Sequence, residues 1–468
     1  MTVQQRISDY FDKNVNAMVD DISRLIRIDS TRGEAAEGMP FGPGPAAALQ
    51  KALAIAEGMG FRVQDDDHFV GTVDLNEGPK HLEILAHLDV VPAGDGWQMT
   101  RPFEPRVIGG RLYGRGAADD KGPAVAALYA MRAVRELGLP VTQNARLLFG
   151  TDEESGFRDL AHYYAHEPEA DMSFSPDADF PLVNVEKGHF SNPFGARWRE
   201  EDTHPRMLSV RGGIRGNVIP RQAVAVVDGL SAEEIKPYAE RAGEKTGVHF
   251  TCRAGVEGTV INAEGVSAHA STPQKGNNPI TALLELLTEL PLAETEGMRK
   301  LRAVHHMFPH GDWLGRACGA AMHDELSGDL TISLNTFAYS PSELTGSFDC
   351  RTPLCATREN LADGMEKRMA AAGIPLTACR MLPGHHVPED SSFVRTLLTC
   401  YETFTGRKGS CRSFGGGTYA HNLKNGVAFG CVMPGVNCRK HGSDERAVVE
   451  DLKTSGKIFA LAIATLCR

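Results

Sequence analysis

The most constraining feature of this sequence is an apolar run that ends abruptly in charged residues. In HLEILAHLDVVPAGDGW, residues 82–86 form the run, His87 and Asp89 follow it, and a Pro/Gly-rich turn comes next. Such a run is typical of a short buried strand. Open α/β sheets bind their ligands beyond the carboxyl ends of their strands. The sequence therefore predicts a site after this strand, with a capped strand end and a surface histidine as the alternative for His87 alone.

Similar transitions recur further along the chain. They end at Asp119, at the acids of GTDEESG (150–156), at Asp177 and at His441. An ordinary helix N-cap explains Asp120, which precedes an expected helix. Three consecutive carboxylates repel one another unless a cation or water lies among them, so an exposed acidic loop is the alternative for residues 150–156. The repetition favours one shared site.

These strand-end residues have the composition of a two-metal centre. The set comprises His87, Asp119, Glu153, Glu154, Asp177 and His441. Two histidines and three carboxylates can hold two divalent cations if one carboxylate bridges them. Nitrogen and oxygen donors suit Zn²⁺ and also admit Mn²⁺ or Co²⁺, whereas a structural zinc site more often uses thiolates. The sixth group, a carboxylate, can accept a proton from metal-activated water, which predicts metal-assisted hydrolysis.

Composition limits the class of protein. The chain has 468 residues, of which 42% are hydrophobic and 23% charged, and its formal net charge is −11. An acidic chain of this kind is not expected to bind nucleic acid or an anionic membrane. The sequence has no apolar run long enough for a membrane span, no secretory h-region and no Cys-x-x-Cys pair among its ten cysteines. We therefore expect a cytoplasmic enzyme with reduced thiols.

The predicted elements suggest an α/β domain that is interrupted by an α+β domain. We expect a catalytic domain from residues 1–185 and 385–468, and an inserted domain from 186–384. The inserted part is predicted to contain a hairpin over 207–229 and a last strand at 375–381. Residues 293–328 show no clear pattern.

Seven segments carry a resemblance to a known family. They are HLDVVPAGDGW, GRGAADDKGP, GTDEESG, SPDADFP, GVSAHAS, DCRTP and CRKHGSDE. Together they resemble the two-metal aminoacylase/carboxypeptidase metallopeptidases, and most closely the bacterial dipeptidase V branch, which is related to carnosinases. This resemblance implies a zinc-exopeptidase-like catalytic domain with a mostly parallel central sheet, and an inserted α+β lid domain.

The resemblance also implies a role for each residue of the predicted centre. His87 and Asp177 would bind one metal, Glu154 and His441 the other, and Asp119 would bridge them. Glu153 would be the general base and later the acid, and Asp89 would orient His87 as a partner of a metal-bound imidazole. The peptide bond between Asp119 and Asp120 is expected to be cis.

Four residues of the inserted domain and the later chain are candidates for substrate binding. The resemblance implies that His269 stabilises the oxyanion and that Asn217 and Arg351 bind the substrate carboxylate. From the residues alone, Asn217 could be a turn residue and Arg351 a surface partner of Asp349. Gly416, in the triplet 415–417, is a candidate anion-binding backbone nest. A serine nucleophile in GVSAHAS is disfavoured, because a histidine stands where that motif needs glycine.

We therefore expect a metallopeptidase that hydrolyses unmodified dipeptides, Xaa-His and β-alanyl dipeptides included, with a metal-bridging hydroxide. An N-acyl-amino-acid deacylase of the same family is the alternative. A pseudoenzyme scaffold is disfavoured because every expected ligand and the surplus carboxylate are present. The inserted domain is long enough for the chain to complete its own site, so we expect a monomer, with a homodimer as the alternative.

Overall fold

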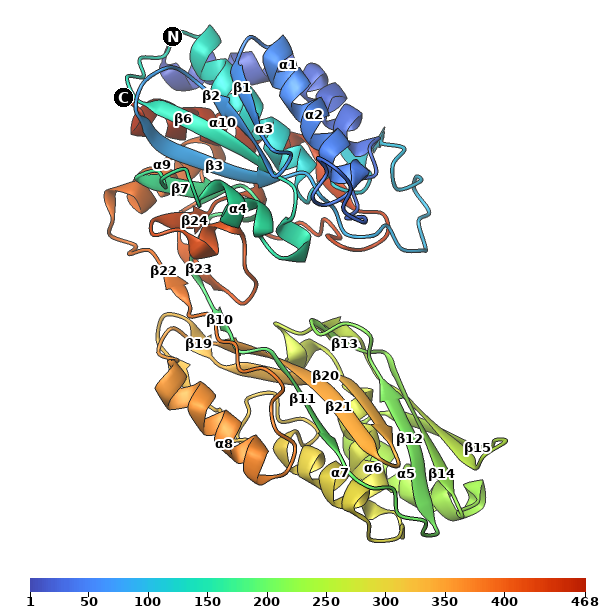
Figure 1. Cartoon of the computed structure of the whole chain (residues 1–468). Helices are drawn as coiled ribbons and strands as arrows, with labels where there is room; N and C mark the ends of the chain where they lie inside the picture. The colour runs from blue at the N-terminus through green and yellow to red at the C-terminus, as the bar shows by residue number, and fades with distance from the viewer. The chain divides into compact units, whose positions relative to one another are not determined.

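A computed structural model describes all 468 residues, which divide into two compact units (Figure 1). The first unit consists of Met1–Val185, His386–Arg412 and Gly417–Arg468. The second unit consists of Glu186–His385 and Ser413–Gly416. The short strands β22 (His385–His386) and β23 (Cys411–Phe414) lie at the boundaries between the segments.

A seven-strand stretch of mixed sheet forms the centre of the first unit. Its order is β1 (Arg62–Asp66), β2 (Val70–Asp74), β6 (Asn144–Gly150), β3 (Lys80–His87), β7 (Met172–Ser175), β24 (Gly426–Ala428) and β9 (Leu182–Glu186). The four strands from β6 to β24 are parallel. The strands on either side of these four are antiparallel. The mostly parallel sheet of the prediction is thus found in the middle of a mixed one.

Helices cover this sheet on both faces. They are α1 (Val3–Ile26), α2 (Pro43–Gly58), α3 (Lys121–Glu136), α4 (Arg158–Tyr163), α9 (Ser392–Thr405) and α10 (Val449–Leu466), with the short helices η1 (Glu153–Ser155) and η4 (Tyr419–Asn422). Alternate residues of β3 point to opposite faces: Ile84 packs with the larger core around α3 and α10, and Leu85 packs with α4 and η4. This alternation follows from the period of two in a strand.

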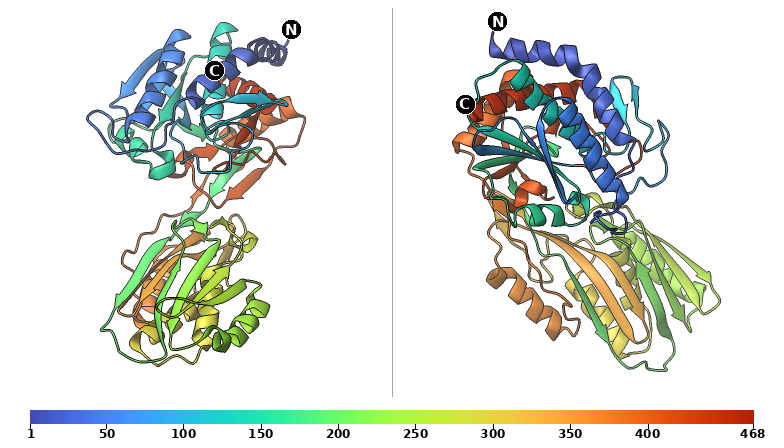
Figure 2. Two further views of the ribbon diagram at one scale, coloured as in Figure 1. Left: turned by 90° about the vertical axis from the view of Figure 1, so that its right-hand side faces the viewer. Right: turned by 45° about the horizontal axis from the view of Figure 1, so that its top comes forward.

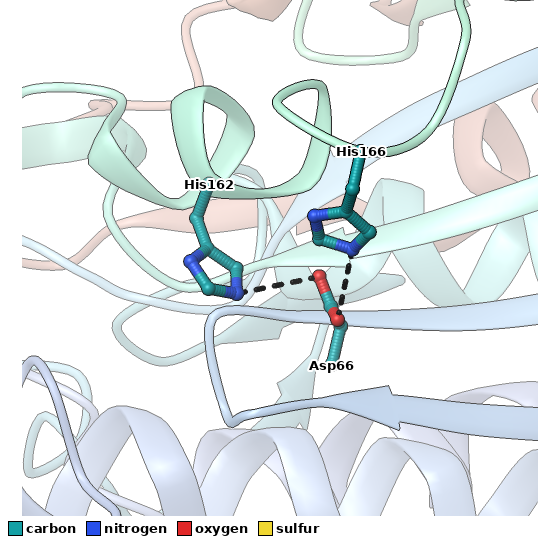
Figure 3. A group of neighbouring side chains, drawn as sticks. All are labelled: Asp66, His162 and His166. Atoms are coloured by element: carbon teal, nitrogen blue, oxygen red, sulfur yellow. Dashed lines mark hydrogen bonds and ion pairs between the residues drawn. The ribbon is translucent and has the colours of Figure 1, made fainter.

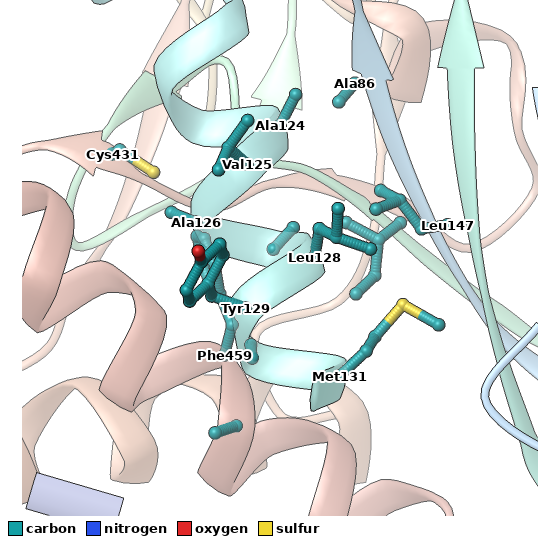
Figure 4. Packing of buried hydrophobic residues seen from close by; sticks show 14 of the residues in the cluster. Ala86, Ala124, Val125, Ala126, Leu128, Tyr129, Met131, Leu147, Cys431 and Phe459 are labelled. Carbon is teal, nitrogen blue, oxygen red and sulfur yellow. The ribbon is translucent and has the colours of Figure 1, made fainter. Parts of the chain in front are cut away.

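The larger core is built around α3. Alanine, valine and leucine side chains of this helix pack against β3, β6 and α10, as Figure 4 shows. The N-terminal helix α1 lies beside α10 (Figure 2). Asp12 of α1 forms ion pairs with Lys453 at 2.9 Å and Lys457 at 3.2 Å. Residues from both ends of the sequence therefore stabilise the same unit.

Small strands complete the first unit. They are β4 (Arg106–Ile108), β5 (Arg111–Tyr113) and β26 (Arg446–Val448) in one sheet, and β8 (Ala178–Asp179) with β25 (Cys431–Val432) in another. All ten cysteines of the chain are free thiols, as expected. None of the helices combines the length and apolar character that a membrane span requires.

The second unit is an antiparallel sheet packed against helices. Its strands are β10 (Gly188–His189), β11 (Asn192–Arg197), β12 (Arg206–Gly212), β14 (Gln222–Asp228), β15 (His249–Ala254), β16 (Thr259–Glu264), β20 (Thr331–Ser340) and β21 (Glu343–Thr352), and the short pairs are β13 (Val218–Ile219) with β17 (Ala268–His269) and β18 (His323–Asp324) with β19 (Gly328–Asp329). Its helices are α5 (Ala232–Thr246), α6 (Pro279–Glu289), α7 (Glu296–Met307) and α8 (Asp363–Ala371), with the short turns η2 (Pro273–Lys275) and η3 (Arg358–Ala362). The α+β character of this part is as predicted.

One local expectation for the second unit is wrong, and one segment without a prediction contains a helix. The strand predicted at 375–381 is absent, because this segment makes only an isolated bridge at Leu376 to Phe194. The segment 293–328, which has no clear sequence pattern, contains α7, whose N-cap Thr295 accepts a hydrogen bond from Met298 N. A single capped helix of twelve residues between irregular segments gives too short a periodic signal to stand out.

Candidate metal centre

The carboxyl end of β3 fixes the first residue of the centre. Leu82–Ala86 is buried, and His87 ends the strand opposite Gly150 of the parallel strand β6. Because parallel strands end at the same edge of a sheet, the acidic turn after β6 lies next to His87. The turn after β3 and the turn after β6 therefore meet at one place in the first unit.

Asp119 lies between the two histidines. Its Oδ1 is 3.0 Å from His87 Nε2, and its Oδ2 is 3.1 Å from His441 Nε2. The loop that carries Asp119 is tight, because a Cβ at Gly122 would lie 2.1 Å from the Ala117 carbonyl oxygen. The peptide bond between Asp119 and Asp120 is cis, which confirms that expectation. One carboxylate thus contacts both imidazoles with different oxygens.

Each histidine has a second carboxylate beside it. Asp177 Oδ2 is 3.5 Å from His87 Nε2, and Glu154 Oε1 is 3.1 Å from His441 Nε2. Donors bound tetrahedrally to Zn²⁺ at about 2.1 Å are about 3.4 Å apart, so these separations fit a cation in each group. The five donors are all nitrogen or oxygen, and no cysteine is among them, which suits catalytic rather than structural zinc.

Glu153 and Asp89 complete what we call the Asp119 centre, together with His87, Asp119, Glu154, Asp177 and His441. Glu153, His87 and Asp177 offer ligand-type atoms within 4.8 Å of one another. Asp89 accepts hydrogen bonds from Glu153 N at 3.2 Å and from Glu154 N at 3.0 Å. His87 Nδ1 is closer to the carbonyl oxygen of Asp89, at 3.0 Å, than to its Oδ1, at 3.5 Å. The Asp89 carboxylate thus fixes the acidic turn, and its carbonyl group orients the imidazole.

Burial and charge shift the protonation of this centre. Burial raises the pKa of Glu153 well above its ordinary value, with nearby carboxylates adding to the shift and His87 opposing it. Burial lowers the pKa of His441, but hydrogen bonds to Asp119 and Glu154 outweigh it and raise the pKa to about 11. A divalent cation must displace such protons when it binds to imidazole and carboxylate.

Several supporting residues were not identified from the sequence. The buried Glu445 accepts hydrogen bonds from the backbone N–H groups of Gly116, Ala118 and Asp119 at 3.0–3.2 Å, and from Arg115 Nη1 at 2.6 Å. It therefore holds the loop that presents Asp119. The acids in CRKHGSDE were visible as part of a motif, but no pattern in the sequence links position 445 to position 119.

The acidic turn has a second support. Asp159, at the start of α4, accepts hydrogen bonds from Thr151 N at 2.7 Å and Asp152 N at 2.9 Å. Tyr419 also donates a hydrogen bond to Asp159, and its ring meets that of His87 edge to face with 6.3 Å between centroids. Asp159 resembles an ordinary acid in a first helical turn, so nothing in the sequence indicates this role.

Lys440 was also missed. Its ammonium group donates a hydrogen bond to Asp177 Oδ1, while Asp177 Oδ2 faces His87. Burial opposes its charge, but Asp177 and Asp119 raise the pKa of Lys440 well above its ordinary value. His441, the next residue, has a φ of 62°, a left-handed conformation that is uncommon for non-glycine residues.

The predicted substrate residues lie in the second unit. Asn217 and His269 are neighbours, because Ala270 N donates to Asn217 O at 2.9 Å and His269 pairs with Val218. His269 Nδ1 accepts a hydrogen bond from Ser271 N at 3.2 Å. A neutral imidazole that accepts at Nδ1 has its proton on Nε2, so His269 can donate from that atom.

Arg351 is already bound by its own unit. Asp349 accepts from its Nε at 2.6 Å and its Nη2 at 3.0 Å, and its Nη1 contacts His189 Nε2 at 3.0 Å and Gly415 O at 2.7 Å. Four of the five N–H groups of a guanidinium are thereby used. Gly416 does not have a positive φ, nor do its two glycine neighbours, so this turn lacks the alternation of an anion-binding nest.

Comparisons with known proteins agree with this geometry. The model of peptidase family M20/M25/M40 matches residues 84–465. "Putative dipeptidase YtjP" of Bacillus subtilis is 36% identical over 463 residues, which cover 96% of this chain and 97% of the relative. "Beta-Ala-Xaa dipeptidase" of Lactobacillus delbrueckii subsp. lactis is 33% identical, with coverage of 97% and 96%.

A solved structure supports the fold. Human carnosine dipeptidase 1 superposes with a TM-score of 0.61 at 15% sequence identity, and the match covers 100% of this chain and 99% of that one. The family match spans every residue of the Asp119 centre. The chain therefore belongs to peptidase family M20/M25/M40 and is a metallopeptidase.

Proposed function

We propose that this protein is a metal-dependent dipeptidase that hydrolyses the peptide bond of unmodified dipeptides, β-alanyl and Xaa-His dipeptides included. The observation that carries the proposal is the position of Asp119, whose two oxygens lie 3.0 and 3.1 Å from the Nε2 atoms of two different histidines. A carboxylate placed in this way is suited to bridge two cations.

Five residues of the first unit would hold the metals. His87 and Asp177 would bind one ion, Glu154 and His441 the other, and Asp119 would bind both. The mixed imidazole and carboxylate set favours Zn²⁺, with Mn²⁺ or Co²⁺ as alternatives. When bound, such ions polarise a carbonyl group and lower the pKa of water to about 7.

Glu153 would move the proton. Its backbone is held by Asp89, and its partly buried carboxylate lies beside His87 and Asp177. A carboxylate whose pKa is raised by burial is matched to proton transfer near neutral pH. Glu153 would accept a proton from the attacking water and then deliver it to the amine of the leaving residue.

The second unit would bind the substrate. His269 would donate from Nε2 to the developing oxyanion, as its hydrogen bond from Ser271 N supports. Asn217 and the remaining N–H of Arg351 would bind the carboxylate end of the dipeptide. The names of the two relatives support a dipeptide rather than an N-acyl amino acid as the substrate.

A substrate panel with metal removal tests the proposal. The purified chain is assayed with β-Ala-His, a second Xaa-His dipeptide, an apolar dipeptide, an N-acetyl amino acid and a tripeptide, before and after dialysis against a chelator. We expect the dipeptides to be hydrolysed fastest, and activity to be lost with the metal and restored by Zn²⁺, Mn²⁺ or Co²⁺. Faster hydrolysis of the N-acetyl amino acid would instead identify a deacylase. Full activity in a metal-free preparation would refute the mechanism.

A further inference from the structure

Three ligand-type side chains gather in the first unit outside the Asp119 centre. Asp66 is the last residue of β1, His162 lies in α4, and His166 lies just after that helix (Figure 3). His166 Nε2 is 3.2 Å from Asp66 Oδ1, and His162 Nε2 is 3.7 Å from Asp66 Oδ2. The three residues, which we call the Asp66 site, offer ligand atoms within 4.8 Å of one another.

The separations suit a single cation. Tetrahedral donors at about 2.1 Å from Zn²⁺ are about 3.4 Å apart, and the two measured distances lie on either side of that value. A spacing of four residues between the histidines brings both imidazoles to one side of a helical turn. The site therefore needs only small side-chain adjustments to enclose an ion.

The imidazole rings are held in place by packing. The ring of His162 stacks on Phe69, with 4.0 Å between centroids and 10° between planes. The ring of His166 meets those of His162 and Tyr163 edge to face. Aromatic contacts of this kind fix a ring plane and so reduce the entropy lost when a ligand binds.

One oxygen of the carboxylate points independently to a ligand. Asp66 Oδ2 is buried and has no hydrogen-bond partner. A buried acceptor without a partner costs free energy, on the order of 1–3 kcal/mol. A cation between Asp66 and the two histidines would remove this cost, because it would coordinate an oxygen that accepts no hydrogen bond and has His162 Nε2 only at 3.7 Å.

We propose that Asp66, His162 and His166 form a third metal site, which binds one late first-row divalent cation, Zn²⁺ by preference. Two imidazoles and one carboxylate suit Zn²⁺, Ni²⁺ or Cu²⁺ better than Mg²⁺ or Ca²⁺, which prefer oxygen donors. Water completes the coordination, since His166 is half exposed. The adjacent Asp67, whose Oδ2 is 3.7 Å from His162 Nε2, adds negative charge.

The bound ion would connect two elements that lie far apart in sequence. It would join the end of β1 to α4, which begins four residues after Glu154. Asp159 in the same helix holds the acidic turn through Thr151 and Asp152. A cation bound at the Asp66 site would therefore restrict movement of α4 away from β1. It would do so from outside the Asp119 centre.

A binding count on the full-length chain tests the site. Metal-stripped wild type and His166→Gln are dialysed to equilibrium against micromolar Zn²⁺, and bound zinc is measured by elemental analysis. We expect wild type to bind one zinc ion per chain more than His166→Gln. His81→Gln is the matched control, because His81 Nδ1 contacts only one carboxylate, that of Asp171, at 2.7 Å. We expect it to bind as many ions as wild type.

A second measurement keeps this test separate from the proposed function. Zn²⁺ should slow amide hydrogen exchange of residues 158–166 in wild type and in Asp119→Ala, but not in His166→Gln. If the Asp119 centre did not bind metal, the number of bound zinc ions would fall equally in wild type and in His166→Gln. The difference of one ion between these two proteins would remain. Equal zinc counts for wild type and His166→Gln, with no zinc-dependent protection of α4, would overturn the proposal.

Discussion

The Asp119 centre and the Asp66 site both place two imidazole nitrogens around one carboxylate, at separations of 3.0–3.1 Å and 3.2–3.7 Å. Their surroundings differ. Asp119 and His87 are buried, and Glu445, Asp89 and Asp159 fix the backbone around them. Asp66 and His162 are partly exposed and His166 half exposed, and their positions depend mainly on ring packing.

This difference in surroundings indicates which of the two sites can do more than bind a metal. The two sites use the same donor atoms, so donor chemistry alone does not distinguish them. The surplus carboxylate of the Asp119 centre, Glu153, has its amide fixed by a buried acceptor, whereas the extra carboxylate beside the Asp66 site, that of Asp67, is exposed. We therefore expect the buried centre to carry the reaction and the exposed site to affect local stability.

The largest expected effect is on turnover. Glu153→Gln keeps the size of the side chain and removes the proton acceptor, so kcat should fall by about 10²–10⁴-fold while the metal content of the Asp119 centre is unchanged. Glu77→Gln, at an exposed glutamate, and His166→Gln should leave kcat near that of wild type. Steady-state kinetics at saturating dipeptide, with metal analysis of each preparation, measure this contrast. Near-normal turnover in Glu153→Gln would show that Glu153 is not the proton acceptor.

The next effect concerns the supports of the buried centre. Arg115→Met leaves Glu445 buried without its cationic partner, which lies 2.6 Å away in the wild type. Breaking a buried pair in this way should lower the free energy of unfolding by about 3–5 kcal/mol. Arg101→Met removes an exposed pair with Glu104 and should cost about 1 kcal/mol or less. Urea unfolding of both variants would test this, and equal losses would contradict the comparison.

A smaller effect on stability is expected for Asp74, which lies in the β1–β2 hairpin at the end opposite to Asp66. Burial opposes the charge of Asp74, but hydrogen bonds from Arg146, Arg62 and Asn144 hold its pKa below the ordinary value. A lowered pKa stabilises the fold above the unfolded value of about 3.9, and this stability is lost as pH falls through the folded pKa. Asp74→Asn should therefore cost about 1.5–3 kcal/mol at pH 7, and less below pH 4.

Urea unfolding across this pH range measures the effect. Asp67→Asn, at an exposed position in the same hairpin, is the control, and its difference from wild type should stay small at every pH. If the loss in Asp74→Asn grew as the pH fell, the charge would not be the source of the stability.

The smallest effect is expected for the Asp66 site in metal-free protein. Because His166 is half exposed, His166→Gln should change the unfolding free energy by less than about 0.5 kcal/mol in the presence of a chelator. With Zn²⁺ present, only wild type should gain stability, since a ligand that binds the native state shifts unfolding by mass action. Thermal unfolding with and without Zn²⁺ gives this comparison, and equal gains in both proteins would argue against the site.

The sequence predicted the parts of the fold that have a strong local pattern. The strand before His87, the helix at 124–137 and the hairpin at 207–229 follow from apolar periodicity and turn residues. The strand expected at 375–381 is absent, since its residues make one bridge and no ladder. Periodicity also missed α7, whose apolar face packs only against its own unit.

The residues of the candidate site also divide into those with a local sequence signal and those without one. His87, Glu153, Glu154 and Asp177 lie at or just after the ends of β3, β6 and β7, a position that is visible in the sequence. Asp119 and His441, also expected at strand ends, lie instead in loops, before α3 and between β25 and β26. The structure brings all six together in the first unit. Glu445 and Asp159 could not be found, because a hydrogen bond across hundreds of residues leaves no local trace. The Asp66 site could not be found from the sequence either. Asp66 lies in an ordinary hairpin, and only the folded structure places it beside α4.

The first unit is discontinuous, and this has a consequence for synthesis of the protein. Asp177 and His441, which contribute to the same centre, are 264 positions apart, and the whole second unit is translated between them. A nascent chain that has emerged from the ribosome as far as Asp177 has the bridging Asp119 but lacks the second imidazole. The Asp119 centre can therefore assemble only after His441 has been translated and the two distant parts of the first unit have folded together.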